Sequence, residues 1–402
     1  MIHSDATNQG GRLPAAENAL LSGGRRLTAL DGIRGIAALA VLVYHGFHVP
    51  LAQVEVSGLT KLIYEAAKPG WLGVDLFFVL SGFLITGILL DSRADKHYFR
   101  NFYARRVLRI VPLYYAALLV LFVCYRDSGP FALLGCFYLT NFASLFGVPM
   151  LFGPLWSLSV EEHFYLLWPW AVRFVNRRAL AGIAVAVCLI SPVARAAAYG
   201  NVHFMDIYYF SCFRFDGLAW GALLALFVRS RSCTARNLKW FARAAACGGL
   251  LILIGGIRHG ILSREQFLGS VLLYSAAQLV FIGLIAAALN PGRTRLKQLL
   301  GWRPLRWCGD VSYCFYLFHV FCFHAWDWSV EHFGIQTEAA VGKLGNVALR
   351  FAFGTAAAFL IAALSYRYFE APILRLKRHF SHDTAADRRT EITGALKAER
   401  AA

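Results

Sequence analysis

Long apolar stretches separated by short, mostly basic connections run along most of the chain. Ten of them lie near residues 30–50, 71–91, 110–126, 154–172, 179–197, 207–228, 240–257, 267–289, 308–330 and 346–369. Each is close to the roughly 20 residues that an α-helix needs to cross the hydrocarbon core of a bilayer. The pattern therefore predicts an all-α integral membrane protein, a bundle of about ten transmembrane helices.

An eleventh apolar stretch, residues 131–148, is interrupted by Thr140, Asn141 and Ser144. Five apolar stretches lie between residues 110 and 228, but an even number of spans must connect two loops on the same side. One stretch therefore does not cross, and the interrupted one has the weakest apolar pattern. We expect residues 131–148 to be re-entrant or to lie on the outer surface.

The basic residues predict the orientation of the bundle. Lys and Arg collect in the connections 91–109, 229–239 and 290–306, whereas 51–70 and 331–345 are nearly charge-balanced. Because cytoplasmic loops carry the excess of Lys and Arg, we expect the first three connections inside and the last two outside. With ten spans, both termini are then cytoplasmic.

The two ends of the chain differ from the rest in composition. Residues 1–27 are polar and small and have no apolar segment of the kind that a signal peptide contains, so a disordered cytoplasmic tail is predicted there. Residues 374–402 are basic and then mixed, which predicts a second, unpacked cytoplasmic tail. Residues 28–373 are left as the membrane domain.

Composition excludes several other classes of protein. Hydrophobic residues make up 58% of the chain and charged residues 16%, against about 25% charged residues in soluble domains. The net charge of +17 is attributed to cytoplasmic loops and to sites for anionic ligands, because no nucleic-acid-binding fold or motif is visible. The nine cysteines form no C-x-x-C pair, and no metal site is expected.

Charged side chains inside the predicted spans indicate function, because each costs about 2.5–3.5 kcal/mol at the bilayer centre. Arg34 and His45 lie eleven residues apart on the first span, which is about three helical turns, so they share one face. At the outer depth of His45 we expect further acidic, basic and imidazole groups: Asp75, Glu161, Glu162, His163, Arg214, Asp216 and His319. Together they predict a proton-transfer chamber.

On the inner side, four arginines predict a mouth for an anionic ligand. Arg34, Arg105, Arg106 and Arg109 are suited to phosphate, which guanidinium groups bind through paired hydrogen bonds. Plainer interpretations remain open for several of these groups. His319 is equally well explained by a helix-to-helix hydrogen bond, and Arg106 and Arg109 by anchoring at the cytoplasmic surface. Since Glu161 and Glu162 point about 100° apart on a helix, one of them is also explained by pairing with an arginine alone.

Several motifs resemble those of the membrane acyltransferase 3 family. They are Arg34-x10-His45, the run GVDLFFVLSGFLIT from Gly73 that contains Ser81, Arg106-x-x-Arg109 before Pro112, WSLSVEE from Trp156, Ser312-Tyr313 with Tyr316 and His319, and Tyr368-Phe369-Glu370-x-Pro372. They occur in order from about residue 28 to 372. One departure is His163, where the family more often has Gln.

The resemblance implies a multi-pass O-acyltransferase of a bacterial inner membrane. Such proteins transfer an acyl group, usually acetyl, from cytoplasmic acyl-CoA to a hydroxyl of a sugar or glycoconjugate such as a surface polysaccharide, lipopolysaccharide or exopolysaccharide. Acyl-CoA is then a co-substrate, and no bound cofactor is expected. By resemblance His45 is the catalytic residue, and Arg34, Arg106 and Arg109 handle the donor. Asp75, Glu161 or Glu162 would set the tautomer and basicity of His45, with Ser81, His163, Arg214, Asp216, Tyr316, His319 and Glu370 in supporting roles.

Two other classes of function are compatible with buried charges. A proton-coupled transporter or flippase of a glycolipid would use them as a proton relay, but transporters tend to show internal repeats, and none is visible here. A sensor or scaffold would not need them. The sequence leaves open the acceptor, the length of the acyl group, the oligomeric state and whether His45 is a base or an acyl carrier.

Overall fold

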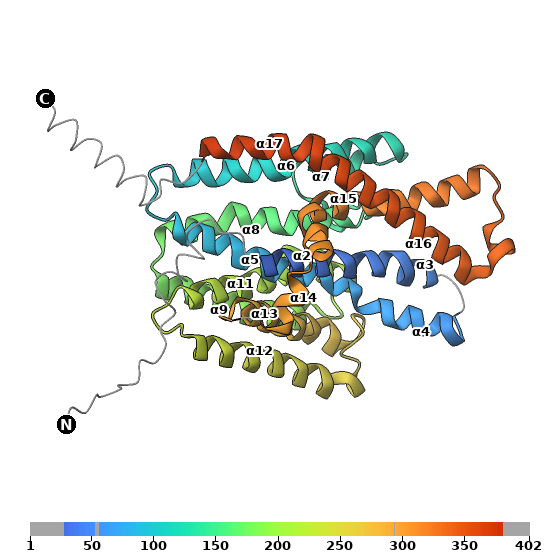
Figure 1. Cartoon of the computed structure of the whole chain (residues 1–402). Coiled ribbons are helices and arrows are strands. Elements are labelled where there is room, and N and C mark those ends of the chain that lie inside the picture. The colour runs from blue at the N-terminus through green and yellow to red at the C-terminus, as the bar shows by residue number, and fades with distance from the viewer. Residues whose placement is uncertain (1–27, 53–55, 293, 381–402) are drawn as a thin grey trace, which may run out of the picture.

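The computed structural model describes residues 28–52, 56–292 and 294–380, and these residues form helices and no β-strand (Figure 1). The all-α prediction is thereby confirmed. The long helices follow one another in the order of the ten apolar stretches: α2 (Thr28–Val43), α5 (Gly73–Asp91), α6 (Tyr98–Cys124), α8 (Pro154–Phe174), α9 (Arg177–Ala198), α11 (Ser211–Val228), α12 (Ala235–Gly256), α13 (Tyr274–Leu289), α15 (Arg303–His332) and α16 (Thr337–Ser365).

Within the described residues, eight helices are long and apolar enough to cross a membrane. The protein is therefore a multi-pass membrane protein. The two long helices outside this group, α8 and α15, carry more polar side chains, among them Glu161 in α8 and His319 in α15. The count of ten spans and the cytoplasmic placement of the termini stay predictions.

Residues 131–148 do not form one long helix. They fold into most of α7 (Gly129–Cys136) and all of η3 (Thr140–Phe146), which ends at Gly147 in the left-handed region with a φ of +65°. Neither helix approaches the roughly 20 residues that a span needs. The prediction that this stretch is not a membrane-crossing helix is consistent with both lengths.

Short helices lie at the ends of the bundle. On the right of Figure 1, α4 (Gly58–Ala67) and the turn between α15 and α16 project from the same end, as expected for two connections predicted to face outward. The remaining short helices are α3 (Val49–Leu51), α10 (Phe204–Tyr209), α14 (Arg295–Leu300) and α17 (Ala371–Arg375).

The predicted unpacked tail from residue 374 is wrong in its first part. Residues Leu376–Phe380 form a 3-10 helix, η7, that packs against α6. The packing puts a basic side chain, Lys377, beside the arginines of α6. Residues 381–402 and the predicted N-terminal tail, 1–27, lie outside the described residues.

Glycines let α2 and α15 pack very closely. A Cβ on Gly309 would lie 1.9 Å from the carbonyl oxygen of Asp31, and one on Gly35 would lie 2.1 Å from that of Leu305. Small residues allow such close approach between membrane helices. The two helices start at the same end of the bundle, and about three to four turns further along they bring His45 and His319 together.

Three helices are interrupted by π-helical turns, a feature that is frequent at functional sites. They are η1 (Tyr44–His48), which contains His45, η5 (Gly269–Leu273) and η6 (Tyr366–Glu370), which coincides with the Tyr-Phe-Glu motif. Such a turn redirects side chains and leaves backbone carbonyl groups for other partners. Two of these three π-helical turns thus contain residues of motifs singled out in the sequence.

Candidate active site

His45 forms a hydrogen-bonded pair with His319. Its Nδ1 lies 3.0 Å from the carbonyl oxygen of Val41 and 3.1 Å from Nε2 of His319. His319 is fully buried, and its own Nδ1 faces the carbonyl oxygens of Phe315 and Tyr316 at 3.2 and 2.8 Å. The sequence placed the two imidazoles at similar depth, and the structure joins them directly.

An ion pair between α15 and α16 contacts the backbone of His45. Arg350 of α16 donates from Nη1 to the carbonyl oxygen of His45 at 3.4 Å, and two of its nitrogens bind Asp327 at 2.7 and 2.9 Å. Sequence reasoning missed this residue, although Arg350 interrupts the apolar stretch 346–369. A charge in that position was itself a signal of a specific interaction.

A cavity of about 320 Å³ lies between α2, α5, α6, α8 and α15. It follows α5 from Val74 to Ile88, a rise of about 21 Å for a helix. Its basic lining residues are Arg34, Arg105, Arg106, Arg109 and Lys377. The structure therefore brings together the four predicted arginines and adds Lys377, which the sequence assigned to the tail.

One of the two predicted glutamates faces this cavity. Glu161 lines it and interacts electrostatically with Arg106 and Arg34. Ser81 also lines it, and its Oγ lies 2.5 Å from the hydroxyl of Tyr165. Glu162, the next residue along α8, does not line the cavity, but it interacts electrostatically with Arg106.

The cavity meets the histidine pair at Tyr316. The ring of this tyrosine lines the cavity, its hydroxyl lies 2.7 Å from Oγ of Ser157, and its ring centroid is 6.0 Å from that of His319. At the basic end, Glu370 of η6 interacts electrostatically with Arg109 and accepts a hydrogen bond from Ser365 at 3.4 Å. Of the seven predicted supporting residues, Tyr316 thus lines the cavity and Glu370 lies next to it.

Asp75 is not the carboxylate partner of His45. It is fully buried and accepts hydrogen bonds from Arg214 at 2.8 Å and from Gln278 at 3.1 Å. The guanidinium of Arg214 also lies over the rings of Tyr274 and Tyr208, at 4.1 and 5.0 Å. Asp75 therefore does not set the tautomer of His45, contrary to the expectation from the sequence. A buried carboxylate is stabilised most by an opposite charge, and Arg214 supplies it.

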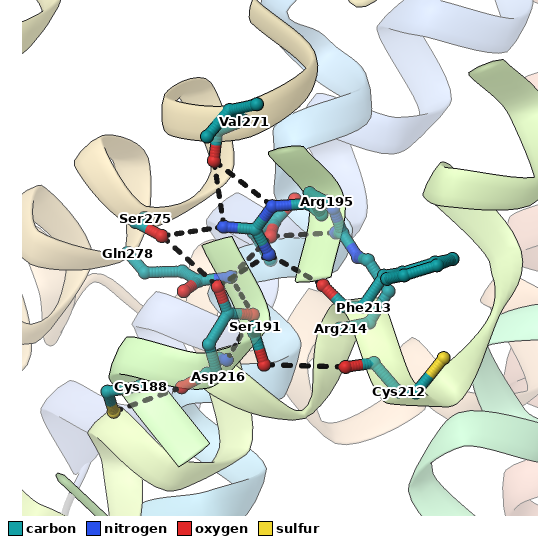
Figure 2. A network of polar contacts seen from close by, with 12 residues as sticks. Cys188, Ser191, Arg195, Cys212, Phe213, Arg214, Asp216, Val271, Ser275 and Gln278 are labelled. Carbon is teal, nitrogen blue, oxygen red and sulfur yellow. Dashed lines mark hydrogen bonds and ion pairs between the residues drawn. The ribbon is translucent and has the colours of Figure 1, made fainter. Parts of the chain in front are cut away.

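A second buried ion pair continues this network, as Figure 2 shows. Asp216 binds Arg195 at 2.8 Å and also accepts from Gln278 at 3.2 Å, so the glutamine links both carboxylates. Arg195 donates as well to the carbonyl oxygen of Val271, in the π-helical turn η5. Arg214 therefore links α11 to α5, and Asp216 links α11 to α9 and α13, whereas neither residue lines the cavity. Sequence reasoning missed Arg195.

His163 faces away from the cavity. Its Nδ1 lies 2.7 Å from Oγ of Ser211, which also accepts from Asn141 at 2.9 Å. Together with Phe142 and Phe215 it lines a separate apolar groove between α8, α9 and α11. Glu161 and His163 therefore lie on different faces of α8, and only Glu161 faces the cavity. The position at which this chain departs from the family pattern, 163, is outside the cavity.

The site defines a class of membrane protein: a bundle whose interior holds a basic cavity with an imidazole pair beside its far end. The family model described as "acyltransferase domain" matches residues 27–367, and the chain belongs to this family, acyltransferase 3.

Three relatives carry names that concern O-acetylation. The peptidoglycan O-acetyltransferase OatA of Listeria monocytogenes is 28% identical over 86% of this chain and 55% of its own length. The putative peptidoglycan O-acetyltransferase YrhL of Bacillus subtilis is 30% identical over 87% of this chain and 55% of its own. The O-acetyltransferase OatA of Staphylococcus aureus is 26% identical over 87% and 57%. The chain thus spans little more than half the length of these relatives, and no solved structure matches it.

Proposed function

We propose that the chain transfers an acyl group, most simply acetyl, from cytoplasmic acyl-CoA to a hydroxyl group of a cell-surface glycan. The observation that carries the proposal is the proximity of two features: Tyr316 lines a cavity with five basic lining residues, and its ring centroid lies 6.0 Å from that of His319, the hydrogen-bond partner of His45. The names of the relatives supply the acetyl group and suggest a glycan such as peptidoglycan as acceptor. The bacterial inner membrane is the proposed location.

The donor would enter from the basic end of the cavity. The phosphates of CoA carry several negative charges, which Arg34, Arg106 and Arg109 would bind through charge-assisted hydrogen bonds. The pantetheine arm would then follow α5 toward Tyr316, over a length of about 21 Å between Ile88 and Val74. Phosphate recognition and chemistry would be separated along the cavity.

His45 would perform the transfer as a general base. Nε2 takes the proton of the acceptor hydroxyl while that oxygen attacks the thioester carbonyl, forming a C–O bond. The C–S bond then breaks, the proton on Nε2 passes to the leaving thiolate, and free CoA is released. If Nε2 instead attacked the thioester, an N–C bond would form and the C–S bond would break with release of the CoA thiolate. The acceptor oxygen would then displace Nε2 from the acyl carbon, and its proton would pass to the thiolate.

Variants at two positions test this division of labour. We expect His45→Ala and His45→Gln to abolish acceptor acylation in membranes while acyl-CoA binding is kept, because Gln retains a hydrogen bond but takes no proton. Arg106→Ala is expected to weaken acyl-CoA binding, and Arg106→Lys to restore it only in part, because Lys lacks the planar two-pronged donor.

Arg243, an exposed arginine of α12, provides the matched control, and Arg243→Ala should bind the donor like the parent protein. Substantial acylation by His45→Gln at equal protein level would refute the proposed chemistry. Transport of a glycolipid without any acylation would instead favour the flippase. A mass increase of one acyl group on His45 after donor addition would select the acyl carrier over the base.

A further inference from the structure

We propose that His319 is a positioning residue that fixes the tautomer of His45, so that Nε2 of His45 is the nitrogen left free for the reaction. The effect of His319 on catalysis rests on the proposed function, whereas the tautomer of His45 follows from the hydrogen-bond partners of the two rings. It assigns to a neutral imidazole the place that a carboxylate holds in other catalytic histidine sites.

The proton on His319 is assigned from its neighbours. Its Nδ1 faces two carbonyl oxygens, those of Phe315 at 3.2 Å and Tyr316 at 2.8 Å. Carbonyl oxygens only accept hydrogen bonds, so this nitrogen must carry a hydrogen. In the neutral ring Nε2 is then an acceptor, and it points at His45.

The proton on His45 follows in turn. Nδ1 of His45 lies 3.1 Å from this accepting nitrogen and 3.0 Å from the carbonyl oxygen of Val41. Both neighbours accept, so Nδ1 carries the hydrogen and donates to them. A neutral His45 with its proton on Nδ1 has its lone pair on Nε2, which among the described residues has no hydrogen-bond partner.

The arrangement also explains why the second imidazole is buried. His319 is fully enclosed, and a carboxylate there would need a positive partner to remain charged in a membrane. A neutral imidazole fixes the ring of His45 at a smaller desolvation cost. When His45 takes the proton of the acceptor on Nε2, its Nδ1–H remains directed at His319, so the ring does not turn during the transfer.

The test combines kinetics with a direct view of the tautomer. We expect His319→Ala to lower kcat by up to about ten-thousandfold, the loss seen when a catalytic histidine is left in the wrong tautomer, with the KM for acyl-CoA nearly unchanged. His319→Gln, whose amide oxygen can still accept from Nδ1 of His45, should stay within about tenfold of the parent. A larger loss of kcat in His319→Ala than in His319→Gln would show that the hydrogen bond to His45, and not only the packing of the side chain, is needed.

Nitrogen-15 NMR of the histidine-labelled protein reports the tautomer without requiring turnover. The His45 signals, identified by their absence in His45→Gln, should show one protonated Nδ1 and one free Nε2, and His319→Ala should give a mixture of tautomers. His332→Ala is the matched control on the same helix; this histidine is exposed and stacks on the ring of Trp328, and its loss should leave both readouts unchanged.

Three results would overturn the inference: a protonated Nε2 on His45 in the parent protein, equal loss of kcat in His319→Ala and His319→Gln, or parental kcat in His319→Ala. Each differs from a failure of the proposed function. That failure would appear as activity in His45→Gln, whatever the tautomer that NMR reports.

Discussion

Replacing Asp75 separates a structural carboxylate from a catalytic one. Asp75 and Arg214 are both fully buried and lie 2.8 Å apart, and within the described residues the arginine forms no second ion pair. Asp75→Asn therefore leaves a buried guanidinium without its counter-charge. Removing one member of a buried pair typically costs about 3–5 kcal/mol, so the folded-to-unfolded ratio should fall by about a hundredfold to a few thousandfold.

Removing both charges should reverse most of that loss. In Asp75→Asn with Arg214→Gln no unpaired charge remains, and the two side chains can still hydrogen-bond with Gln278 nearby. We expect the double variant to be more stable than the single one by about 2 kcal/mol or more, and to keep acyl transfer per folded molecule. The free energy of unfolding is measured by denaturant titration of the purified protein in detergent.

A partly exposed pair serves as the control. Asp91 and Arg229 lie 2.7 Å apart but remain 30% and 13% exposed, so Asp91→Asn should cost about 1 kcal/mol or less. If Asp75→Asn were as stable as the parent yet inactive, and the double variant were equally inactive, the carboxylate would belong to the chemistry and the structural assignment would be wrong.

Three further outcomes are expected. Arg350→Ala should lower kcat by up to about a hundredfold with donor binding kept, because the backbone of His45 loses a donor at 3.4 Å, and Asp327→Asn should have a smaller effect in the same assay. His163→Gln should acylate like the parent in membrane assays, since this side chain faces the groove with Ser211, away from the basic cavity; a large loss would return it to the site. In a background without native cysteines, Leu59→Cys on α4 should react with an impermeant thiol reagent from outside and Arg236→Cys should not, and the reverse pattern would invert the orientation.

The basic cavity was predictable because its residues follow local rules. Arg106 and Arg109 lie three residues apart, so they share a helix face, and basic residues next to a span collect on its cytoplasmic side. Arg34 and His45 are similarly fixed by their spacing on one helix. Lys377 was not predictable in this way, since it reaches the cavity only because η7 folds back onto α6.

The partners of the buried charges were not predictable from one sequence. Asp75, Arg214, Asp216 and His319 were each recognisable as unusual in a membrane, but which of them meet depends on how helices pack. The pairing of His45 with His319 follows from the close contact of α2 with α15 at Gly309, which no spacing along the chain reveals.

The charged side chains inside the bundle fall into two groups: those that form ion pairs within it and those that line the cavity and are available to a ligand. Asp75 with Arg214 and Asp216 with Arg195 cancel one for one deep in the bundle, as charges in lipid are expected to do. The cavity does not follow this rule: among the described residues five basic side chains and one acidic one, Glu161, line it. Asp31, Glu162 and Glu370 lie near these basic groups without lining the cavity. The lining of the cavity thus carries an excess of positive charge, which favours a polyanion over a neutral solute as its ligand.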